Sequence, residues 1–145
     1  MFPPPKAGPG GTANRFVEKV WESPGRYAYG IPLGAKQPSP AVSLKGLMRV
    51  HVMNLEAAGE PLLVTFSPGG KRAQAFDREQ DGRSLRFENA GDGRMVDLAT
   101  RSTWDVVTGE CQEGTLKGRQ LTPRAGTLSY RETWRSFFPK GKIEP

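Results

Sequence analysis

Apolar and polar residues alternate with a period of two in several short stretches of the chain, which is the period of β-strands. Alternation over residues 47–53 predicts a half-buried strand whose polar face carries His51. Residues 61–66 are apolar almost throughout and predict a more central strand. Asp81-Gly82 and Gly91-Asp-Gly93 are turn signals between further short apolar stretches. This succession of short strands favours a compact antiparallel β domain.

Two segments have helical spacing instead. Apolar residues recur at that spacing over 15–21, behind Asn14 as N-cap, which predicts one or two helical turns. Near the end, Ser129 and Glu132 have the spacing of a capping box and predict a helix over 128–138 that Pro139 ends. We expect the aromatic residues of this helix to close one side of the sheet.

Composition agrees with a single small domain. The chain has 145 residues, and its 18 Gly and 13 Pro favour short strands and many turns over long helices. We therefore predict a β-rich α+β fold, with a small antiparallel sheet or barrel-like core, one C-terminal helix and a Pro/Gly-rich N-terminal arm. In this interpretation residues 1–14 form the flexible arm and residues 41–143 form the β-rich domain. Residues 15–40 form a short helix and an extended wrapping segment, with a loop from Tyr27 to Ala41.

Charge and cysteine usage narrow the function classes. Six Lys or Arg against two acids give residues 1–45 a charge of +4 out of the +6 of the whole chain. A single cysteine, Cys111, excludes an intrachain disulfide and a Cys-rich zinc site, and a single histidine excludes a His-His metal motif. We expect no metal and no cofactor. No apolar run reaches the length of a secretory signal core or a membrane span, so the chain as written predicts a cytoplasmic protein, with a trimmed exported form left open.

The densest motif begins at Asp97. Its positions are Asp97, Thr100, Ser102, Trp104, Gly109, Gly114, Leu116, Gly118, Leu121 and Trp134. Asp, Thr and Ser at this spacing can bond neighbouring amides in a turn, and a tryptophan can anchor the core beneath them. The pattern resembles the prokaryotic family called domain of unknown function 3179 over roughly residues 40–143. This resemblance implies a shared fold and a structural role for the motif's tryptophans and glycines.

The same resemblance reaches the stretch VTFSPGGKRA, residues 64–73. In many family members this turn resembles C-x-x-C-G, a spacing that can hold a redox pair or two soft metal ligands. Ser67 and Gly70 stand at the two cysteine positions in this chain. The resemblance therefore implies the fold more strongly than any chemistry.

Three functional interpretations follow from these residues. The favoured one is a non-catalytic or degenerate binding module for a protein partner or a small anionic ligand, with these ligand-binding candidates: Ser67, Gly69, Gly70, Lys71, Arg72, Asp97, Thr100 and Ser102. The second is an enzyme that holds a small anionic substrate on Lys71 and Arg72, with His51 or Asp97 as general base or a Ser67-His51-Asp97 triad.

The third interpretation, less favoured, is a basic nucleic-acid-associated module that works through residues 1–45, where Arg26, Tyr27, Tyr29 and Lys36 lie close in sequence. Cys111 is interpreted as a small buried residue, with a reactive thiol as the alternative.

Overall fold

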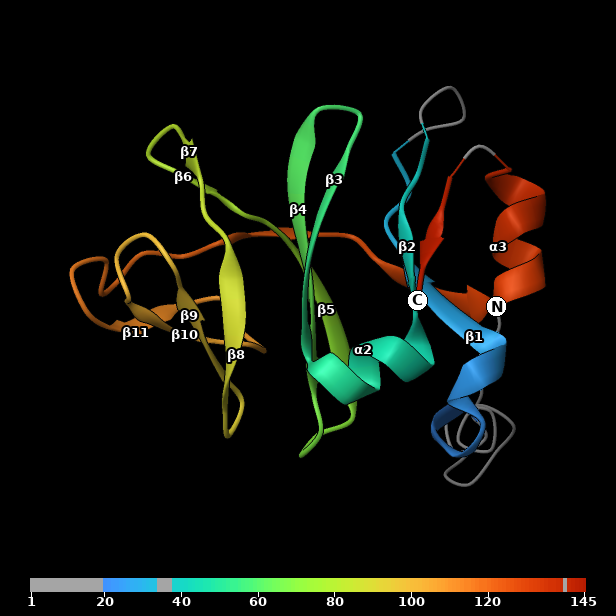
Figure 1. The fold of residues 1–145 in the computed structure, drawn as a ribbon, viewed down its shortest axis with the longest axis horizontal. Coiled ribbons are helices and arrows are strands. Elements are labelled where there is room, and N and C mark those ends of the chain that lie inside the picture. The colour runs from blue at the N-terminus through green and yellow to red at the C-terminus, as the bar shows by residue number, and fades with distance from the viewer. Residues whose placement is uncertain (1–19, 34–37, 140) are drawn as a thin grey trace, which may run out of the picture.

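The computed structural model of the protein describes residues 20–33, 38–139 and 141–145. Three four-stranded sheets stand side by side in it (Figure 1). We call them the motif sheet, the central sheet and the outer sheet, from left to right in that view. The predicted β-rich fold with a C-terminal helix is confirmed, and the sheets of the described residues do not close into a barrel. The predicted arm at 1–14 and most of the predicted helix at 15–21 lie outside the described residues.

The strand order of each sheet brings distant parts of the chain together. The motif sheet has the order β11 (Cys111–Glu113), β10 (Thr103–Asp105), β9 (Arg94–Asp97) and β8 (Phe87–Gly91). The central sheet has the order β12 (Thr122–Arg124), β5 (Arg72–Asp77), β4 (Glu60–Ser67) and β3 (Val52–Ala57). The outer sheet has the order β13 (Thr127–Tyr130), β1 (Tyr27–Gly30), β2 (Ala41–Ser43) and β14 (Ile143–Glu144), and β14 joins β2 in parallel.

The remaining elements are short. A hairpin of β6 (Glu79–Gln80) and β7 (Arg83–Ser84) turns at Asp81-Gly82, as predicted, with φ angles of 52° and 79°. The 3-10 helix η2 (Pro24–Arg26) precedes β1. The α-helices that lie wholly within the described residues are α2 (Leu44–Val50) and α3 (Arg131–Phe137), and residues 20–22 are helical as well. The helix α3 lies outside the outer sheet and α2 lies between the outer and central sheets (Figure 1).

Strand β4 is buried on both faces because it lies between two layers. Leu62, Val64 and Phe66 belong to a core shared with α2 and the outer sheet, whereas Leu63 belongs to a second core shared with the motif sheet. Thr65 points the same way as Leu63, and its hydroxyl donates to the carbonyl of Val106 at 2.6 Å. The predicted central strand over 61–66 is therefore confirmed.

The predicted strand over 47–53 is wrong in its first half, because residues 44–50 form α2. Ser43 caps this helix, since its Oγ accepts a hydrogen bond from the Gly46 amide at 3.2 Å. Leu44 and Leu47, one turn apart, are both fully buried. The helix ends at His51, whose φ of 71° is left-handed, and only then does β3 begin. The Ser43 cap and the buried leucines at helical spacing thus decide the local structure, although residues 47–50 alternate like a strand.

Two further local predictions are corrected. Tyr27 to Gly30 form a buried strand between β13 and β2 rather than part of a loop, because pairing on both sides satisfies their backbone. The capping box is absent, since Ser129 lies in β13 and α3 begins at Arg131 without a side-chain cap. Trp134 of α3 packs on the outer sheet with Ala28 and Ala41, and Phe138 packs against the same cluster. Phe137 and Tyr130 are exposed, so only part of the predicted aromatic face covers the sheet.

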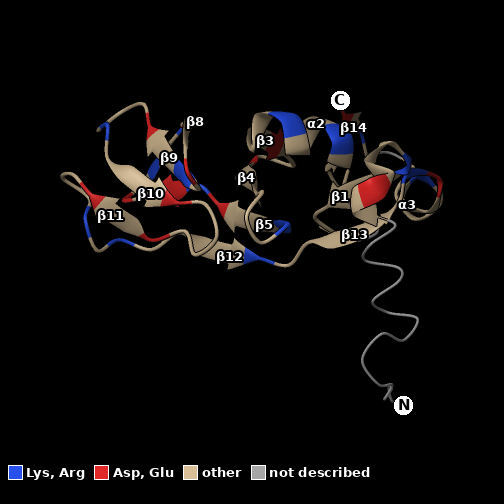
Figure 2. Ribbon diagram, turned by 90° about the horizontal axis from the view of Figure 1, so that it is seen from below, with Lys and Arg blue, Asp and Glu red and all other residues tan. Residues whose placement is uncertain are grey.

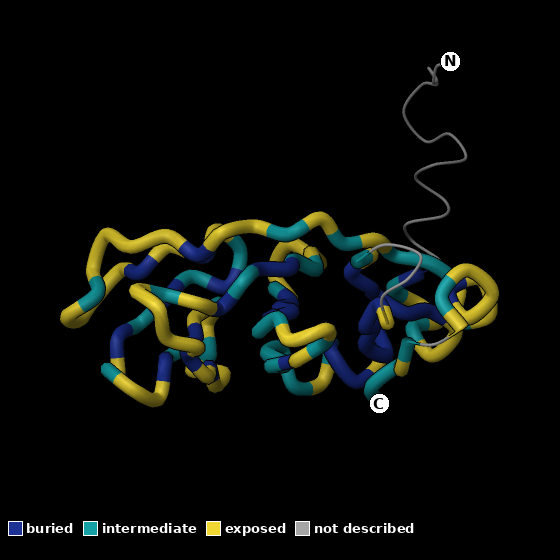
Figure 3. The backbone as a smooth tube through the Cα atoms, turned by 90° about the horizontal axis from the view of Figure 1, so that it is seen from above, coloured by how far each residue is buried: buried dark blue, intermediate teal, exposed yellow. Residues whose placement is uncertain are grey.

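One segment ties the three sheets together. After the motif sheet, the Leu121 amide donates to the Gly109 carbonyl at 2.9 Å, β12 then pairs with β5, and β13 pairs with β1. Figure 2 shows this segment running along one side of all three sheets. Figure 3 shows that much of it is exposed, while the buried residues lie in and between the sheets.

Candidate functional site

The turn from Ser67 to Arg72 lies at the tip of the β4–β5 hairpin. Ser67 and Arg72 are the last paired residues of the two strands. Gly69, Gly70 and Lys71 between them are exposed, and Lys71 has a left-handed φ of 51°. His51 lies beside this hairpin, since its carbonyl accepts from the Phe66 amide at 2.8 Å and its ring centroid lies 5.8 Å from that of Phe66.

The carboxylate of Asp97 lies at the centre of a different cluster, in the motif sheet. Its Oδ1 accepts from the Thr100 amide at 2.6 Å and from the Thr100 hydroxyl at 2.9 Å, and its Oδ2 accepts from Trp104 Nε1 at 2.9 Å. Thr100 Oγ1 and Ser102 Oγ are 2.7 Å apart, and the Leu116 amide donates to Ser102 Oγ at 3.3 Å. Asp97 and Ser102 are fully buried, so this cluster fixes the turn from inside.

The two candidate clusters do not converge. Asp97 pairs with Phe87, whose backbone bonds the side chain of Asn54, and Asn54 pairs with Leu63. Leu63 is four residues from Ser67 along β4, which corresponds to roughly 13 Å of strand. The structure thus brings His51 close to the Ser67–Arg72 hairpin tip. The hydrogen bonds of the Asp97 carboxylate within the described residues go instead to Thr100 and Trp104.

Cys111 lies next to the Asp97 cluster and is almost completely buried. Burial raises the pKa of its thiol above the ordinary value, although hydrogen bonds with the Glu113 backbone and the Ser102 hydroxyl act in the opposite direction. Its Sγ donates to the Glu113 carbonyl at 3.4 Å. The thiol therefore stays protonated at neutral pH, as the interpretation of Cys111 as a small buried residue requires.

A groove of about 550 Å³ lies between the β3–β4 hairpin of the central sheet and the segments that flank β2 and β14 in the outer sheet, and we call it the edge groove. One wall is residues 53–58 of the β3–β4 hairpin, and the other is Pro38, Ser39 and Pro40 together with Gly141, Lys142 and Glu144. Five consecutive residues of β3, 53–57, line this groove together with the loop residue Ala58. Consecutive strand residues can line a groove only where it runs along the strand's edge, because successive side chains point to opposite faces. Nothing in the sequence pattern marks these residues.

A second depression, of about 560 Å³, lies where η2 meets the start of α3, and we call it the basic hollow. Arg26, Arg131 and Arg135 line it together with Glu132 and Tyr130. The sequence singled out Arg26 through its place in a basic segment, but it gave no sign that residues more than one hundred positions later would lie beside it.

Two further observations concern chemistry and membranes. Within the described ranges, no three His, Cys, Asp or Glu residues gather closely enough to hold a metal ion. No helix among the residues that the structure describes has the length and apolar character needed to cross a bilayer.

These features define a class: a β-rich domain of three small sheets whose most conspicuous motif is a buried polar cluster. The chain belongs to the family described as protein of unknown function (DUF3179), whose family model matches residues 31–143. No curated protein and no solved structure matches the chain.

Proposed function

We propose that the protein is a non-catalytic binding module that takes an extended polypeptide segment into the edge groove. The observation that carries this proposal is that β3 and β14, each an edge strand of its sheet among the described residues, line the same groove. Such an edge can bind an extended peptide through backbone hydrogen bonds, while alternate side chains of the peptide meet the walls.

The register of the β3–β4 hairpin identifies the groups on that edge. Ala58-Gly59 is a two-residue loop with φ angles of 53° and 77°, so Ala57 and Glu60 close the hairpin. Because ladder bonds alternate in an antiparallel pair, Leu55 also bonds β4, whereas Glu56 directs its N–H and C=O outward.

Pro61, which faces Glu56, fits this assignment. It has no N–H to give to β3, and its carbonyl accepts from the Arg78 amide at 3.1 Å, on the side of β5. The backbone of Glu56 is therefore available to an added strand, and by the same alternation so is that of Asn54.

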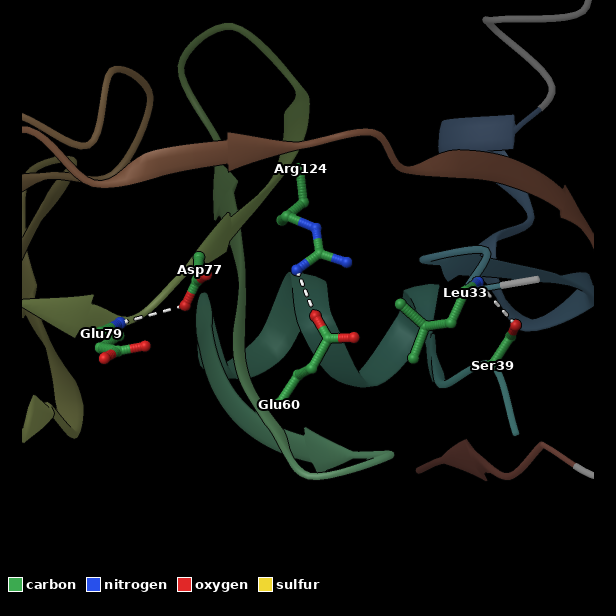
Figure 4. A network of polar contacts seen from close by, with 6 residues as sticks. All are labelled: Leu33, Ser39, Glu60, Asp77, Glu79 and Arg124. Carbon is green, nitrogen blue, oxygen red and sulfur yellow. Dashed lines mark hydrogen bonds and ion pairs between the residues drawn. The ribbon is translucent and has the colours of Figure 1, made fainter. Parts of the chain in front are cut away.

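Both walls of the edge groove are held in place by contacts that Figure 4 shows. Arg124 Nη1 lies 2.6 Å from Glu60 Oε1, which fastens the β3–β4 hairpin to β12. The Leu33 amide donates to Ser39 Oγ at 2.8 Å on the opposite wall. Fixed walls lower the total entropic cost of binding, because only the peptide and not the protein has to become ordered.

The charge of the edge groove favours a basic peptide. Its lining contains Glu56 and Glu144 against Lys142, which is a net charge of −1 in a chain of net charge +6. Met53, Leu55 and Ala57 supply the apolar side chains of the β3 wall. We expect a segment in which apolar residues alternate with polar ones and a Lys or Arg faces Glu56 or Glu144.

A displayed library of random twelve-residue peptides, selected on the purified protein, tests the proposal. We expect enriched peptides to have this alternation, and a synthetic copy to slow amide exchange at Asn54 and Glu56. Replacing every second peptide amide by its N-methyl form should weaken binding by about tenfold or more, since it removes the hydrogen bonds of one edge.

A matched pair of variants completes the test. Ala57→Phe fills the groove and should abolish binding, whereas Ala90→Phe on β8, the edge strand of the motif sheet, should leave it intact. Enriched peptides that bind Ala57→Phe as tightly as the unchanged protein would contradict the proposal, as would a library that yields no binder.

A further inference from the structure

The basic hollow combines groups that come from both ends of the chain. Arg26 belongs to η2, and Tyr130, Arg131 and Arg135 belong to the end of β13 and to α3. Pairing between β1 and β13 brings these segments together, because Tyr27 lies opposite Tyr130 in the register. The hollow has no lining residue in common with the edge groove.

The hollow has an excess of positive charge. Three arginines line it against one acid, Glu132. The ion pairs among the described residues are Arg119–Asp81 and Arg124–Glu60, so no carboxylate of these residues lies within ion-pair distance of Arg26, Arg131 or Arg135. Guanidinium groups bind phosphate oxygens through two parallel N–H donors, and they also stack on flat rings. A phosphate-bearing ligand therefore matches this lining.

A stacking surface adjoins the arginines. The rings of Tyr27 and Tyr130 are stacked, with centroids 4.8 Å apart and an interplanar angle of 24°. Tyr27 is 3% exposed and lies beneath, whereas Tyr130 is 47% exposed and presents its ring to solvent. An exposed tyrosine beside a cationic surface is the arrangement with which proteins stack a base while they hold the backbone phosphates.

We infer that the basic hollow binds single-stranded nucleic acid, with phosphates on Arg26, Arg131 and Arg135 and a base stacked on Tyr130. An anionic membrane would match the positive charge of the basic hollow, but the described surface around the hollow lacks the apolar side chains that membrane binding needs. Peripheral membrane binding needs a broad apolar face, and Phe137 is the exposed large apolar residue on α3, with Leu98 far away after β9.

Fluorescence anisotropy with a labelled twelve-nucleotide oligothymidylate, titrated at several salt concentrations, tests the inference. We expect saturable binding at low salt that weakens as salt rises, with a logarithmic slope of about −2 if three phosphates are neutralised. Arg131→Gln with Arg135→Gln should weaken binding about tenfold or more and make the slope shallower. Tyr130→Leu should weaken binding about tenfold at an unchanged slope, because it removes stacking and no charge.

Two controls keep this test decisive. Arg83→Gln with Arg94→Gln removes the same charge from exposed positions on β7 and β9 and should change affinity less than twofold. Tyr130→Phe keeps the ring and should bind like the unchanged protein. The inference is overturned if no binding occurs at low salt, if both double variants lose affinity equally, if Tyr130→Leu binds normally, or if vesicles containing phosphatidylserine compete with the oligonucleotide through Phe137.

Discussion

Trp104 donates its indole Nε1–H to Asp97 Oδ2 across 2.9 Å, and both residues are 0% exposed. The ring of Trp104 also meets that of Phe87 edge-on, with centroids 5.5 Å apart. A buried carboxylate is costly unless donors surround it, and Thr100 supplies the others. The motif residues at 97–104 therefore stabilise one another, and the indole contributes both volume and a donor.

Comparing the two motif tryptophans separates these contributions. Trp134 is also buried, but its Nε1 has no partner among the described residues. Trp104→Phe loses ring volume and a hydrogen bond to a charged group, whereas Trp134→Phe loses ring volume alone. We expect Trp104→Phe to lower the free energy of unfolding by about 1–2 kcal/mol more than Trp134→Phe does. Urea unfolding of both variants gives this difference, and equal losses would mean that the Asp97 bond adds no net stability.

Two motif glycines provide a second matched comparison. Gly114 and Gly118 both have left-handed φ angles, of 105° and 92°. A Cβ at Gly114 would lie 2.5 Å from Ser102 Oγ and 2.8 Å from Ser102 Cα, whereas a Cβ at Gly118 would meet no atom within 4 Å. We expect Gly118→Ala to cost about 1 kcal/mol from backbone strain and Gly114→Ala about 3 kcal/mol, because the Asp97 cluster must also move. Thermal unfolding measures both, and similar losses would contradict this account of Gly114.

Local patterns predicted the features whose causes are local. The run over 61–66 indicated a more central strand, and Asp81-Gly82 indicated a hairpin, because both signals lie within a few residues. The strand Tyr27–Gly30 escaped detection because its partner β13 is one hundred residues away and Gly and Pro surround it. Residues 47–50 alternate like a strand, yet the Ser43 cap and the burial of Leu47 make them helical.

In the candidate site, too, the sequence predicted local contacts but not those that depend on the tertiary fold. Sequence reasoning placed the Asp97, Thr100 and Ser102 side chains in one turn, and the structure joins them by hydrogen bonds. It could not show that His51 lies in another layer from Asp97, since this depends on how the sheets stack. The edge groove and the basic hollow arise from segments that only the tertiary fold brings together, so no spacing in the sequence reveals them.

Arg78 is a buried cation that the sequence does not distinguish from its exposed neighbours. It is 5% exposed and donates to the carbonyls of Leu55, Leu62 and Leu85 at 2.8 to 3.0 Å. Burial lowers the pKa of its guanidinium below the ordinary value. Arg78→Lys keeps the charge but cannot reach three carbonyls, so we expect a loss of about 2–3 kcal/mol in urea unfolding.

The control for Arg78 is Arg83→Lys, a change at an exposed position on β7. This change should cost less than about 0.5 kcal/mol. If Arg78→Lys were as stable as Arg83→Lys, the three carbonyl bonds would not be holding the ends of β3 and β4 to the segment after β7.

Cys111 should make the protein less stable in alkali. Burial raises the pKa of its thiol, so the folded chain keeps the proton at pH values where the unfolded chain, with a thiol pKa of about 8.5, has lost it. Unfolding therefore releases a proton above about pH 8.5. Below that pH the thiol leaves the free energy of unfolding unchanged. Above it the free energy of unfolding falls as pH rises toward the folded pKa, by at most about 1.4 kcal/mol per pH unit.

Urea unfolding from pH 7 to pH 10 of the unchanged protein and of Cys111→Ala isolates this effect. Burial also raises the pKa of Tyr29, which adds a decline of the same sign at higher pH, but that residue is present in both proteins. The variant should be less stable by a constant amount at pH 7 to 8, because it loses the buried sulfur, and the gap should narrow above about pH 8.5. Two parallel curves would show that the thiol titrates alike in the folded and unfolded chains, and that burial beside Ser102 does not hold its proton.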